Sequence, residues 1–373
     1  MKIAVVTPGR SHLLNMSKEF VKAGHEVVFY TMVSKSRCEK FGLKRENVIS
    51  FFYICAPLML LYRKIKLPFD WNRWIYYFVV RIVDWLSSIF LKRCDILITI
   101  SGCGIRSAKK AKTKYKALFF VDRGCKHILA QDCILKNTPG AKLVFQPDIP
   151  NELFQYDYAD QIILPSNHSK ESFEEYGVPE NKLFVNPYGV NNSIFGPTAL
   201  TSPHYDVIMV GIWTYRKGVD LLIRACKTAN LTLLHVGPIG DADFPNDSQF
   251  THVDPVNETE LPQYYSQAKI LCLPSREDGF GLVLFQALAC GLPVVYSHNT
   301  GGPDLRNLLE CKQYLIEFNT YTSESLTEAL LAGIKQSLCL NNPRSFLTKN
   351  DLNNISWDAY GNRYNQFLAR YPR

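Results

Sequence analysis

Short apolar runs alternate with amphipathic stretches along the first part of the chain. The opening has an apolar run at Ile3–Thr7, a turn at Pro8-Gly9-Arg10, a helical pattern over Ser11–Ala23 and a second run at Glu26–Tyr30. This order of strand, loop, helix and strand is typical of a parallel sheet covered by helices. Four more buried strands are predicted in the same region: Asp95–Ile100, Ala117–Val121, Leu143–Phe145 and Gln161–Leu164.

The same rhythm restarts after residues 188–204, a segment rich in Gly, Pro, Asn and Ser that we interpret as a linker. Helices are expected from about Val219 and over Leu282–Cys290, and an amphipathic helix over Ser356–Ala369. The sequence therefore predicts two β/α domains with a cleft between them. The strands of the second series are expected at Asp206–Val210, Leu231–Val236, Lys269–Leu273 and Val294–Tyr296.

One very apolar stretch, Trp74–Leu91, is interrupted by Arg81 and Asp84, and its polar residues fall near one helical face. This pattern favours an amphipathic helix over a membrane span, which needs about 20 apolar residues. Two interpretations stay open: the helix faces the core, or it lies on a membrane surface. The second would use the basic residues on either side: Arg63, Lys64, Lys66, Lys92 and Arg93.

The net charge of +8 is divided unevenly along the chain. Residues 1–147 carry 26 Lys and Arg against 9 Asp and Glu, a net charge of +17, whereas residues 148–373 carry 16 against 25, a net charge of −9. Such asymmetry indicates an anionic partner for the first domain, either an acidic membrane surface or a substrate with phosphate groups. Nucleic acid is not expected, because no recognition motif accompanies the basic residues.

The cysteines and the N-terminus bear on location. The eleven cysteines include no CxxC pair, and the first apolar run, Ile3–Val6, is too short for a signal peptide. We therefore expect a cytoplasmic protein, either free or peripheral at a membrane surface.

The clearest candidate site lies in residues 274–295, which read PSREDGFGLVLFQALACGLPVV. Gly279 and Gly281 let the backbone approach a ligand closely, and the free amides at the start of the following helix form an anion site. Asp278 can accept hydrogen bonds from hydroxyl groups. Gln286 lies eight residues further on, about two helical turns, and so on roughly the same face. The pattern favours a long polar ligand that carries phosphate.

A second candidate site places Arg216 and Lys217 in the loop before a predicted helix. Adjacent cations at a helix N-terminus oppose the helix dipole, so this position suggests that they face an anion.

Two groups of residues in the first domain are expected to face the cleft. Asp122, Arg123 and His127 gather in the loop after a predicted strand, and Gly9 and Arg10 end the first strand. A lone histidine is more often structural than catalytic, so the pattern alone does not assign His127.

The segment around Asp278 resembles the donor site of glycosyltransferase family four. The resemblance implies that Asp278 contacts the hydroxyls of a donor sugar, with Glu277 as the other acid that could do so. Gln286 stands where the family has a second carboxylate near the nucleoside ribose, and it would bind a diol without charge assistance. The loop amides would meet the sugar and the diphosphate: Gly279, Phe280 and Gly281.

Other roles follow from the same resemblance. Arg216 and Lys217 would hold the diphosphate and neutralise the leaving group, and His127 is the candidate for a first-domain histidine that reaches the donor sugar. The segments around Leu164-Pro165-Ser166-Asn167 and Trp357 are similar to the family as well.

The fold implied is GT-B, an α/β architecture of two Rossmann-like domains facing across a cleft. Residues 1–190 would form the N-terminal, acceptor-side domain and residues 191–355 the donor-side domain. Residues 356–373 would form a C-terminal helix that packs back on the first domain.

The predicted function is that of a retaining glycosyltransferase of the hexosyltransferase type. It would move a sugar from a nucleotide diphosphate donor to a hydroxyl of a glycan or lipid-linked glycan acceptor. In retaining members of the family, which lack an obvious enzyme nucleophile, the leaving phosphate is thought to help deprotonate the acceptor. We expect no cofactor and no metal, and the expected partners are the donor, the acceptor and an anionic membrane surface.

Two alternatives stay open. One is a sugar-nucleotide epimerase or a phosphorylase of the same fold. The other is a non-catalytic sugar-nucleotide binding protein, which the replacements at Asp278 and Gln286 suggest. An NAD-dependent dehydrogenase is disfavoured because the glycine fingerprint after a strand is incomplete.

Overall fold

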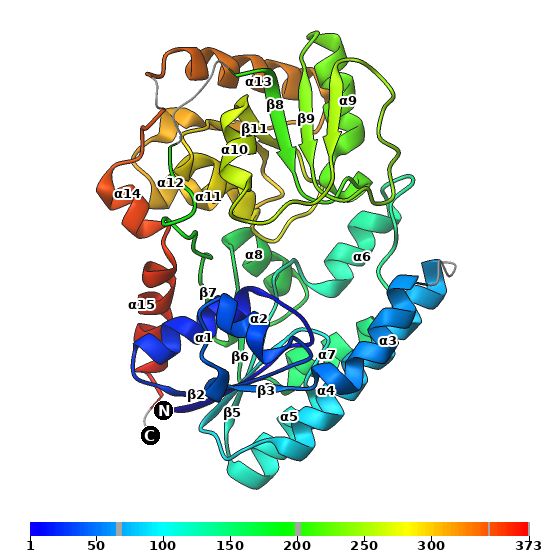
Figure 1. Ribbon diagram of the computed structural model, residues 1–373, viewed down its shortest axis with the longest axis vertical. Helices are drawn as coiled ribbons and strands as arrows, with labels where there is room; N and C mark the ends of the chain where they lie inside the picture. The colour runs from blue at the N-terminus through cyan, green and yellow to red at the C-terminus, as the bar shows by residue number, and fades with distance from the viewer. Residues whose placement is uncertain (65–68, 198–202, 342–343, 372–373) are drawn as a thin grey trace.

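Two parallel sheets stand at opposite ends of the molecule (Figure 1). The computed structural model describes residues 1–64, 69–197, 203–341 and 344–371, so Lys66 and part of the predicted linker lie outside the described residues. The first sheet has the order β3-β2-β1-β4-β5-β6-β7. Its strands are β1 (Lys2–Val6), β2 (Glu26–Thr31), β3 (Val48–Ser50), β4 (Ile96–Ile100), β5 (Leu118–Asp122), β6 (Gln161–Leu164) and β7 (Leu183–Val185).

The helices of the first domain cover both faces of this sheet. Each face has its own apolar cluster, and the two clusters meet in β1, where Val5 belongs to one and Val6 to the other. The helices are α1 (His12–Lys22), α2 (Lys35–Lys40), α3 (Phe52–Lys64), α4 (Phe69–Phe90), α5 (Ile105–Lys110), α6 (Ile128–Lys136), α7 (Ile149–Tyr158) and α8 (Asn167–Glu175).

The second sheet has the order β10-β9-β8-β11-β12-β13 and is also parallel. Its strands are β8 (Tyr205–Val210), β9 (Leu233–Val236), β10 (Phe250–Val253), β11 (Ala268–Leu273), β12 (Val294–Ser297) and β13 (Leu315–Phe318). Its helices are α9 (Val219–Thr228), α10 (Leu261–Ser266), α11 (Leu282–Ala289), α12 (Gly302–Leu308), α13 (Ser323–Leu338) and α14 (Lys349–Asn354).

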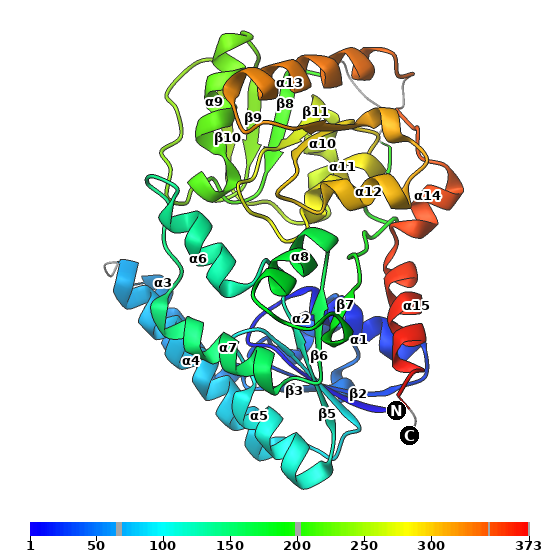
Figure 2. The ribbon, with the colours of Figure 1, turned by 180° about the vertical axis from the view of Figure 1, so that it is seen from behind.

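The chain crosses between the domains twice, at neighbouring places. Val190 donates its backbone N–H to the carbonyl of Ile355 at 2.7 Å, so the outgoing and returning segments lie side by side. The returning chain forms α15 (Trp357–Leu368), which lies beside α1 in both ribbon views (Figures 1 and 2). The structure therefore confirms two Rossmann-like domains and a final helix that returns to the first of them.

One predicted strand is wrong. Residues 143–145 form no strand and no helix, and the Phe145 ring packs against α4 at 5.0 Å from Trp74 and 5.8 Å from Tyr77. A run of three apolar residues is compatible with a buried strand and also with a loop that packs on an aromatic helix. In this protein the run is a loop, and its Phe145 packs on α4.

The predicted helix at Trp74–Leu91 is confirmed as α4, but its polar face points inward. Asp84 is 2% exposed and accepts hydrogen bonds from the backbone N–H groups of Arg106 and Ser107, at 2.9 and 3.0 Å. It therefore holds the start of α5, and large apolar side chains of α4 are left on the outside. Among the described residues, no helix has the length and apolar character needed to cross a bilayer.

Candidate functional site

The loops that follow β5 and β11 meet at the centre of the molecule. A Cβ atom on Gly279 would lie 2.0 Å from the Gly124 carbonyl oxygen, so only glycine allows the two backbones this approach. The Gly279 carbonyl also accepts hydrogen bonds from the hydroxyls of Ser166 and Ser169, at 2.5 and 3.2 Å. The carboxyl ends of the two sheets thus face each other, with the candidate residues between them.

Arg276 fixes the loop before α11 to the start of α9. Its guanidinium group makes a bidentate ion pair with Asp220, with distances of 2.6 and 2.8 Å, and also donates to the Tyr215 carbonyl. This clamp brings the acids that follow Arg276 next to the cations that precede α9.

Lys217 forms an ion pair with Asp278. Both side chains are largely buried, and the other Asp278 oxygen faces the backbone N–H of Phe280 at 3.4 Å. Burial alone would raise the pKa of Asp278, but the charges of Lys217 and Arg216 outweigh it and hold that pKa below its usual value. Asp278 is therefore a carboxylate at neutral pH.

Arg216 faces the other acid, Glu277. The Glu277 side chain is fully buried and lies 3.0 Å from the Arg216 guanidinium group. It also accepts hydrogen bonds from the Gln131 side chain at 2.8 Å and from the Lys126 backbone at 3.3 Å, both in the first domain. Glu277 is thus directed toward the first domain, whereas Asp278 stays with the second.

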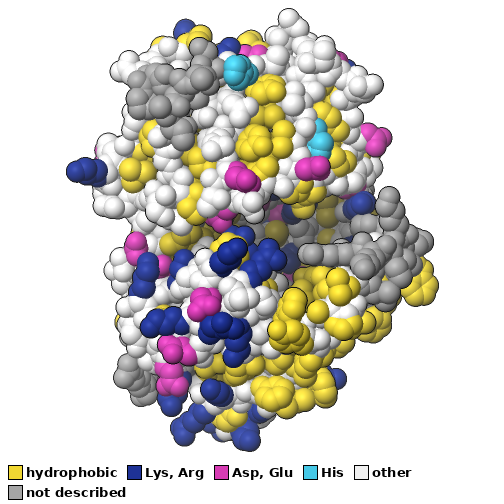
Figure 3. Space-filling view, in the orientation of Figure 1, with side chains coloured by type: hydrophobic (Ala, Val, Ile, Leu, Met, Phe, Trp, Pro, Cys, Tyr) yellow, Lys and Arg dark blue, Asp and Glu magenta, His cyan; other side chains and the backbone are white. Residues whose placement is uncertain are grey.

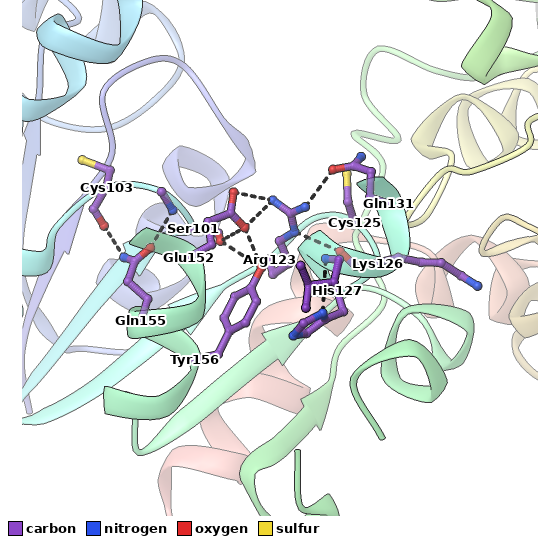
Figure 4. Close-up of polar contacts among 12 residues, drawn as sticks. Ser101, Cys103, Arg123, Cys125, Lys126, His127, Gln131, Glu152, Gln155 and Tyr156 are labelled. Carbon is purple, nitrogen blue, oxygen red and sulfur yellow. Dashed lines mark hydrogen bonds and ion pairs between the residues drawn. The ribbon is translucent and has the colours of Figure 1, made fainter. Parts of the chain in front are cut away.

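The polar contacts continue through the first domain as a buried chain of side chains (Figure 4). Gln131 accepts a hydrogen bond from Arg123 at 2.9 Å, and Arg123 forms an ion pair with Glu152 at 2.7 Å. Glu152 in turn accepts hydrogen bonds from the Ser101 and Tyr156 hydroxyls at 2.6 and 2.5 Å. We call the series Ser101–Glu152–Arg123–Gln131–Glu277–Arg216 the cleft network. It links the ends of strands in the two sheets without a break.

A cavity of about 350 Å³ opens at the first-domain end of the cleft network. It lies between α4, the segments that follow β1 and β4, and the start of α7. Burial, with the nearby charge of Glu152, raises the pKa of Asp148 on its wall to about 6. Its lining offers aromatic rings, two acids and one cation: Arg73, Tyr76, Tyr77, Phe145, Asp148 and Glu152.

Phe280 and Gly281 precede α11, and Gln286 lies in the second turn of this helix. Gly281 has a φ of +81° at the N-cap, a conformation that suits glycine. The Phe280 ring is buried, and its centroid lies 5.2 Å from that of Tyr188 in an edge-to-face contact. Gln286 accepts a hydrogen bond from the Tyr265 hydroxyl at 2.9 Å, which fixes its amide oxygen.

Gly9 lies at the end of β1 with open space where a side chain would start. The neighbouring Arg10 reaches across the cleft to Glu258 at 2.5 Å. Arg10 and Glu258 line a larger cavity between the domains, of about 970 Å³. Lys and Arg side chains gather along the first-domain edge of this cleft (Figure 3).

His127 lies inside the first domain. It is the N-cap of α6, and its Nδ1 accepts a hydrogen bond from the Leu129 backbone N–H at 3.3 Å. Its ring stacks on Tyr176 with centroids 4.5 Å apart. Burial, with the charge of Arg123, lowers the pKa of His127 to about 4, so the ring is neutral at pH 7. These contacts describe a capping residue, and its catalytic role stays a prediction.

Sequence reasoning missed half of the cleft network. Arg123, Arg216 and Glu277 were candidates from the sequence, whereas Ser101, Gln131 and Glu152 were not. It also missed His12, whose Nε2 lies 2.7 Å from Asp122 at the end of β5. Within the described ranges, no group of three or more His, Cys, Asp or Glu side chains could hold a metal ion.

Comparison with known proteins agrees with this geometry. Residues 204–336 match the family model described as "Glycosyl transferases group 1". An uncharacterised glycosyltransferase of Haemophilus influenzae is 23% identical over 364 residues, covering 93% of this chain and 91% of that protein.

Several solved structures resemble the whole chain, and two of them illustrate the likeness. Sucrose-phosphate synthase from Thermosynechococcus elongatus has a TM-score of 0.67 at 15% identity, covering 99% of this chain and 98% of that one. Anabaena Alr3699/HepE, solved with UDP and glucose, has a TM-score of 0.66 at 14% identity over 100% of both chains. The fold is GT-B, and the comparisons together support a transferase enzyme.

Proposed function

We propose that this glycosyltransferase moves a sugar from a nucleotide diphosphate donor to a hydroxyl of a glycan or lipid-linked glycan. The observation that carries the proposal is the meeting of two cations, two carboxylates and a helix N-terminus at the cleft. The GT-B neighbour that was solved with UDP and glucose supports a donor of this class.

The donor would lie on the second domain. The amides before α11 lie at the N-terminus of this helix, where free N–H groups and the helix dipole stabilise phosphate oxygens. Lys217 and Arg216 would stabilise the charge that develops on the departing diphosphate. Asp278, held as a carboxylate, would accept hydrogen bonds from sugar hydroxyls, and Gln286 would reach the ribose.

The acceptor would enter the 350 Å³ cavity of the first domain. Aromatic rings there can pack on the faces of a sugar, and Ser101 and Glu152 can hydrogen-bond its hydroxyls. Ser101 and Glu152 are also the first two members of the cleft network, so the acceptor and the donor phosphates would be joined by one continuous set of polar contacts. A lipid-linked acceptor would be met at an anionic membrane surface.

We further propose that the configuration of the sugar is retained. Asp278 is ion-paired to Lys217, a state that suits an electrostatic role better than attack on the sugar carbon. The leaving phosphate would then take the proton of the acceptor hydroxyl, as the resemblance to family four implies. NMR of the anomeric proton in the product distinguishes retention from inversion.

The test is a thermal-shift screen against nucleoside diphosphates and nucleotide sugars. A ligand at 100 times its dissociation constant should stabilise the protein by about 2.7 kcal/mol. We expect one base to stand out and its shift to disappear in Lys217→Ala. The matched control is Lys335→Ala, which removes an exposed lysine on α13 and should leave the shift intact. No shift with any ligand would contradict the proposal, and conversion of the donor with no acceptor present would instead indicate an epimerase.

A further inference from the structure

A stripe of large apolar side chains runs along the outer side of α4. Successive members are three, four, seven and four residues apart, which is the spacing of one face of a helix. Their exposed fractions lie between 41% and 64%. A soluble monomer rarely leaves a continuous apolar surface of this kind uncovered. The stripe consists of Trp71, Trp74, Phe78, Trp85 and Ile89.

The opposite side of the same helix is built into the protein. Tyr77 and Val80 line the cavity that we assign to the acceptor, and Asp84 holds the start of α5. Polar and ionic contacts therefore fix the inner side, while the outer side is apolar. Contacts within this chain explain the polar inner side of α4, but they do not explain its apolar outer side.

The preceding helix extends the apolar surface. Tyr53, Ile54 and Leu60 of α3 are exposed, and α3 packs on α4. Both helices stand at the outer edge of the first domain in the two ribbon views (Figures 1 and 2). In the space-filling view, hydrophobic side chains gather over this corner of the first domain (Figure 3).

A basic cluster lies at the end of the stripe. Lys92 and Arg93 follow α4 directly and are exposed. The end of α5 and the segment after it are tied to the same place, because Lys110 donates to the Ser88 carbonyl at 2.5 Å and Tyr115 donates to the Leu91 carbonyl at 2.9 Å. The exposed cations of this cluster are Lys92, Arg93, Lys109, Lys114 and Lys116.

We propose that the stripe on α4 lies in the plane of an acidic phospholipid bilayer, with the basic cluster on the lipid headgroups. Tryptophan and tyrosine favour the interface between lipid and water, and cations beside an apolar stripe complement an anionic surface. A second copy of the chain is the less suitable occupant, because pairing two stripes in antiparallel fashion would cover the apolar side chains but leave each basic cluster without an anionic partner.

This inference rests on the proposed function only for the acceptor. The cavity lies on the far side of α4 from the stripe, one helix diameter away, or about 10 Å. If the stripe lies in the bilayer surface, a lipid-linked acceptor with its tail in the bilayer would have its polar head about 10 Å above that surface, level with the cavity. Membrane binding itself needs neither donor nor acceptor, so it can be tested alone.

The experiment is co-sedimentation of the full chain with vesicles of phosphatidylcholine, with and without phosphatidylglycerol, at physiological salt. We expect binding to the anionic vesicles and a blue shift of tryptophan emission, since three of the five tryptophans belong to the stripe. The combined variant Phe78→Gln, Trp85→Gln and Ile89→Gln should bind about tenfold more weakly or worse. Lys92→Gln and Arg93→Gln should each weaken binding about fivefold.

The matched control is Leu331→Gln with Leu338→Gln, which changes two exposed leucines on α13 and should leave binding unchanged. Absence of binding to anionic vesicles, or equal binding by the stripe variant, would overturn the proposal. If the protein did not bind vesicles but formed a dimer, and the stripe variant abolished this dimer, the occupant of the stripe would be a second copy of the chain. Donor thermal shifts are measured on the same variants, so a failed donor site and a failed membrane surface give different results.

Discussion

Replacing Gly279 with alanine tests whether the close meeting of the two central loops is needed for turnover. The added Cβ would lie 2.0 Å from the Gly124 carbonyl oxygen and 2.6 Å from Cys125 Cα, both backbone atoms of the first domain. Real Cβ contacts essentially never fall below 3.0 Å, so the loops must separate by about 1 Å. The Gly279 backbone itself needs no unusual φ, so the strain arises between the domains and not within the loop.

The expected loss is large for catalysis and small for folding. A misplacement of about 1 Å in the reacting groups can cost about 10²-fold in rate, so kcat should fall by about that factor. The hydrogen bonds from Ser166 and Ser169 to the Gly279 carbonyl are neutral ones worth about 1 kcal/mol each, so the loss of unfolding free energy should not exceed about 2 kcal/mol. Donor affinity should fall less than kcat, because the Gly279 amide and the other proposed donor contacts stay together on the second domain while the first-domain loop is displaced.

The assay is release of nucleoside diphosphate from the donor that the thermal-shift screen identifies, with small-angle scattering as the measure of domain separation. The control is Gly196→Ala, where an added Cβ meets nothing within 4 Å. If Gly279→Ala kept the wild-type kcat together with an unchanged radius of gyration, the closed contact would have no part in turnover and the reasoning would be refuted.

Three further outcomes are expected. Gln286→Glu should tighten donor binding, seen by calorimetry, because a charged acceptor strengthens a hydrogen bond to a ribose hydroxyl roughly twofold; weaker binding would place the ribose elsewhere. Glu152→Gln should lower the free energy of unfolding by about 3–5 kcal/mol in denaturant titrations, because it leaves the buried Arg123 guanidinium group without its counter-ion. His127 and His235 are buried with a pKa of about 4, so each binds fewer protons in the folded protein than in the unfolded chain below pH 6.5. Each should lower stability by about 1.4 kcal/mol per pH unit between pH 6.5 and pH 4, and Asp148, with its raised pKa, opposes this fall below pH 6. A flat profile in denaturant titrations would show that the two rings are protonated in the folded protein.

The strands at the centre of each sheet could be predicted from the sequence. The part of the site that could be predicted is the part whose residues are neighbours in the sequence. β6 begins and ends at the predicted residues, Gln161–Leu164, because a strand buried on both faces reads as an unbroken apolar run. The short edge strands β3 and β7 were not predicted, since three residues carry too little pattern. The loop from Asp278 to Gly281 was found because its glycines, acid and helix start are neighbours in sequence.

Contacts between distant segments could not be predicted in this way. Glu277 and Asp278 are adjacent and chemically alike, so the sequence cannot tell which faces the first domain. In the structure Glu277 contacts Gln131 and Asp278 contacts Lys217, and these contacts distinguish the two acids. Similarly, the polar residues of α4 predicted an amphipathic helix, but its orientation depends on Asp84 meeting the start of α5. A periodic pattern gives the faces of a helix, whereas the partner that covers each face is fixed by the tertiary fold.

The return of α15 to the first domain has a consequence for how the protein is made. Tyr364 and Phe367 of α15 pack on Phe20 and Phe184, with ring centroids 4.9 Å apart in the first pair and 3.9 Å in the second. Roughly 180 residues separate Phe184 from Phe367, so a ribosome needs about 10–40 s to produce them at the usual rate. During that interval the first domain has emerged with an aromatic surface still uncovered. Its completion is therefore the last step of assembly, and the nascent chain offers chaperones a site that the finished protein no longer has.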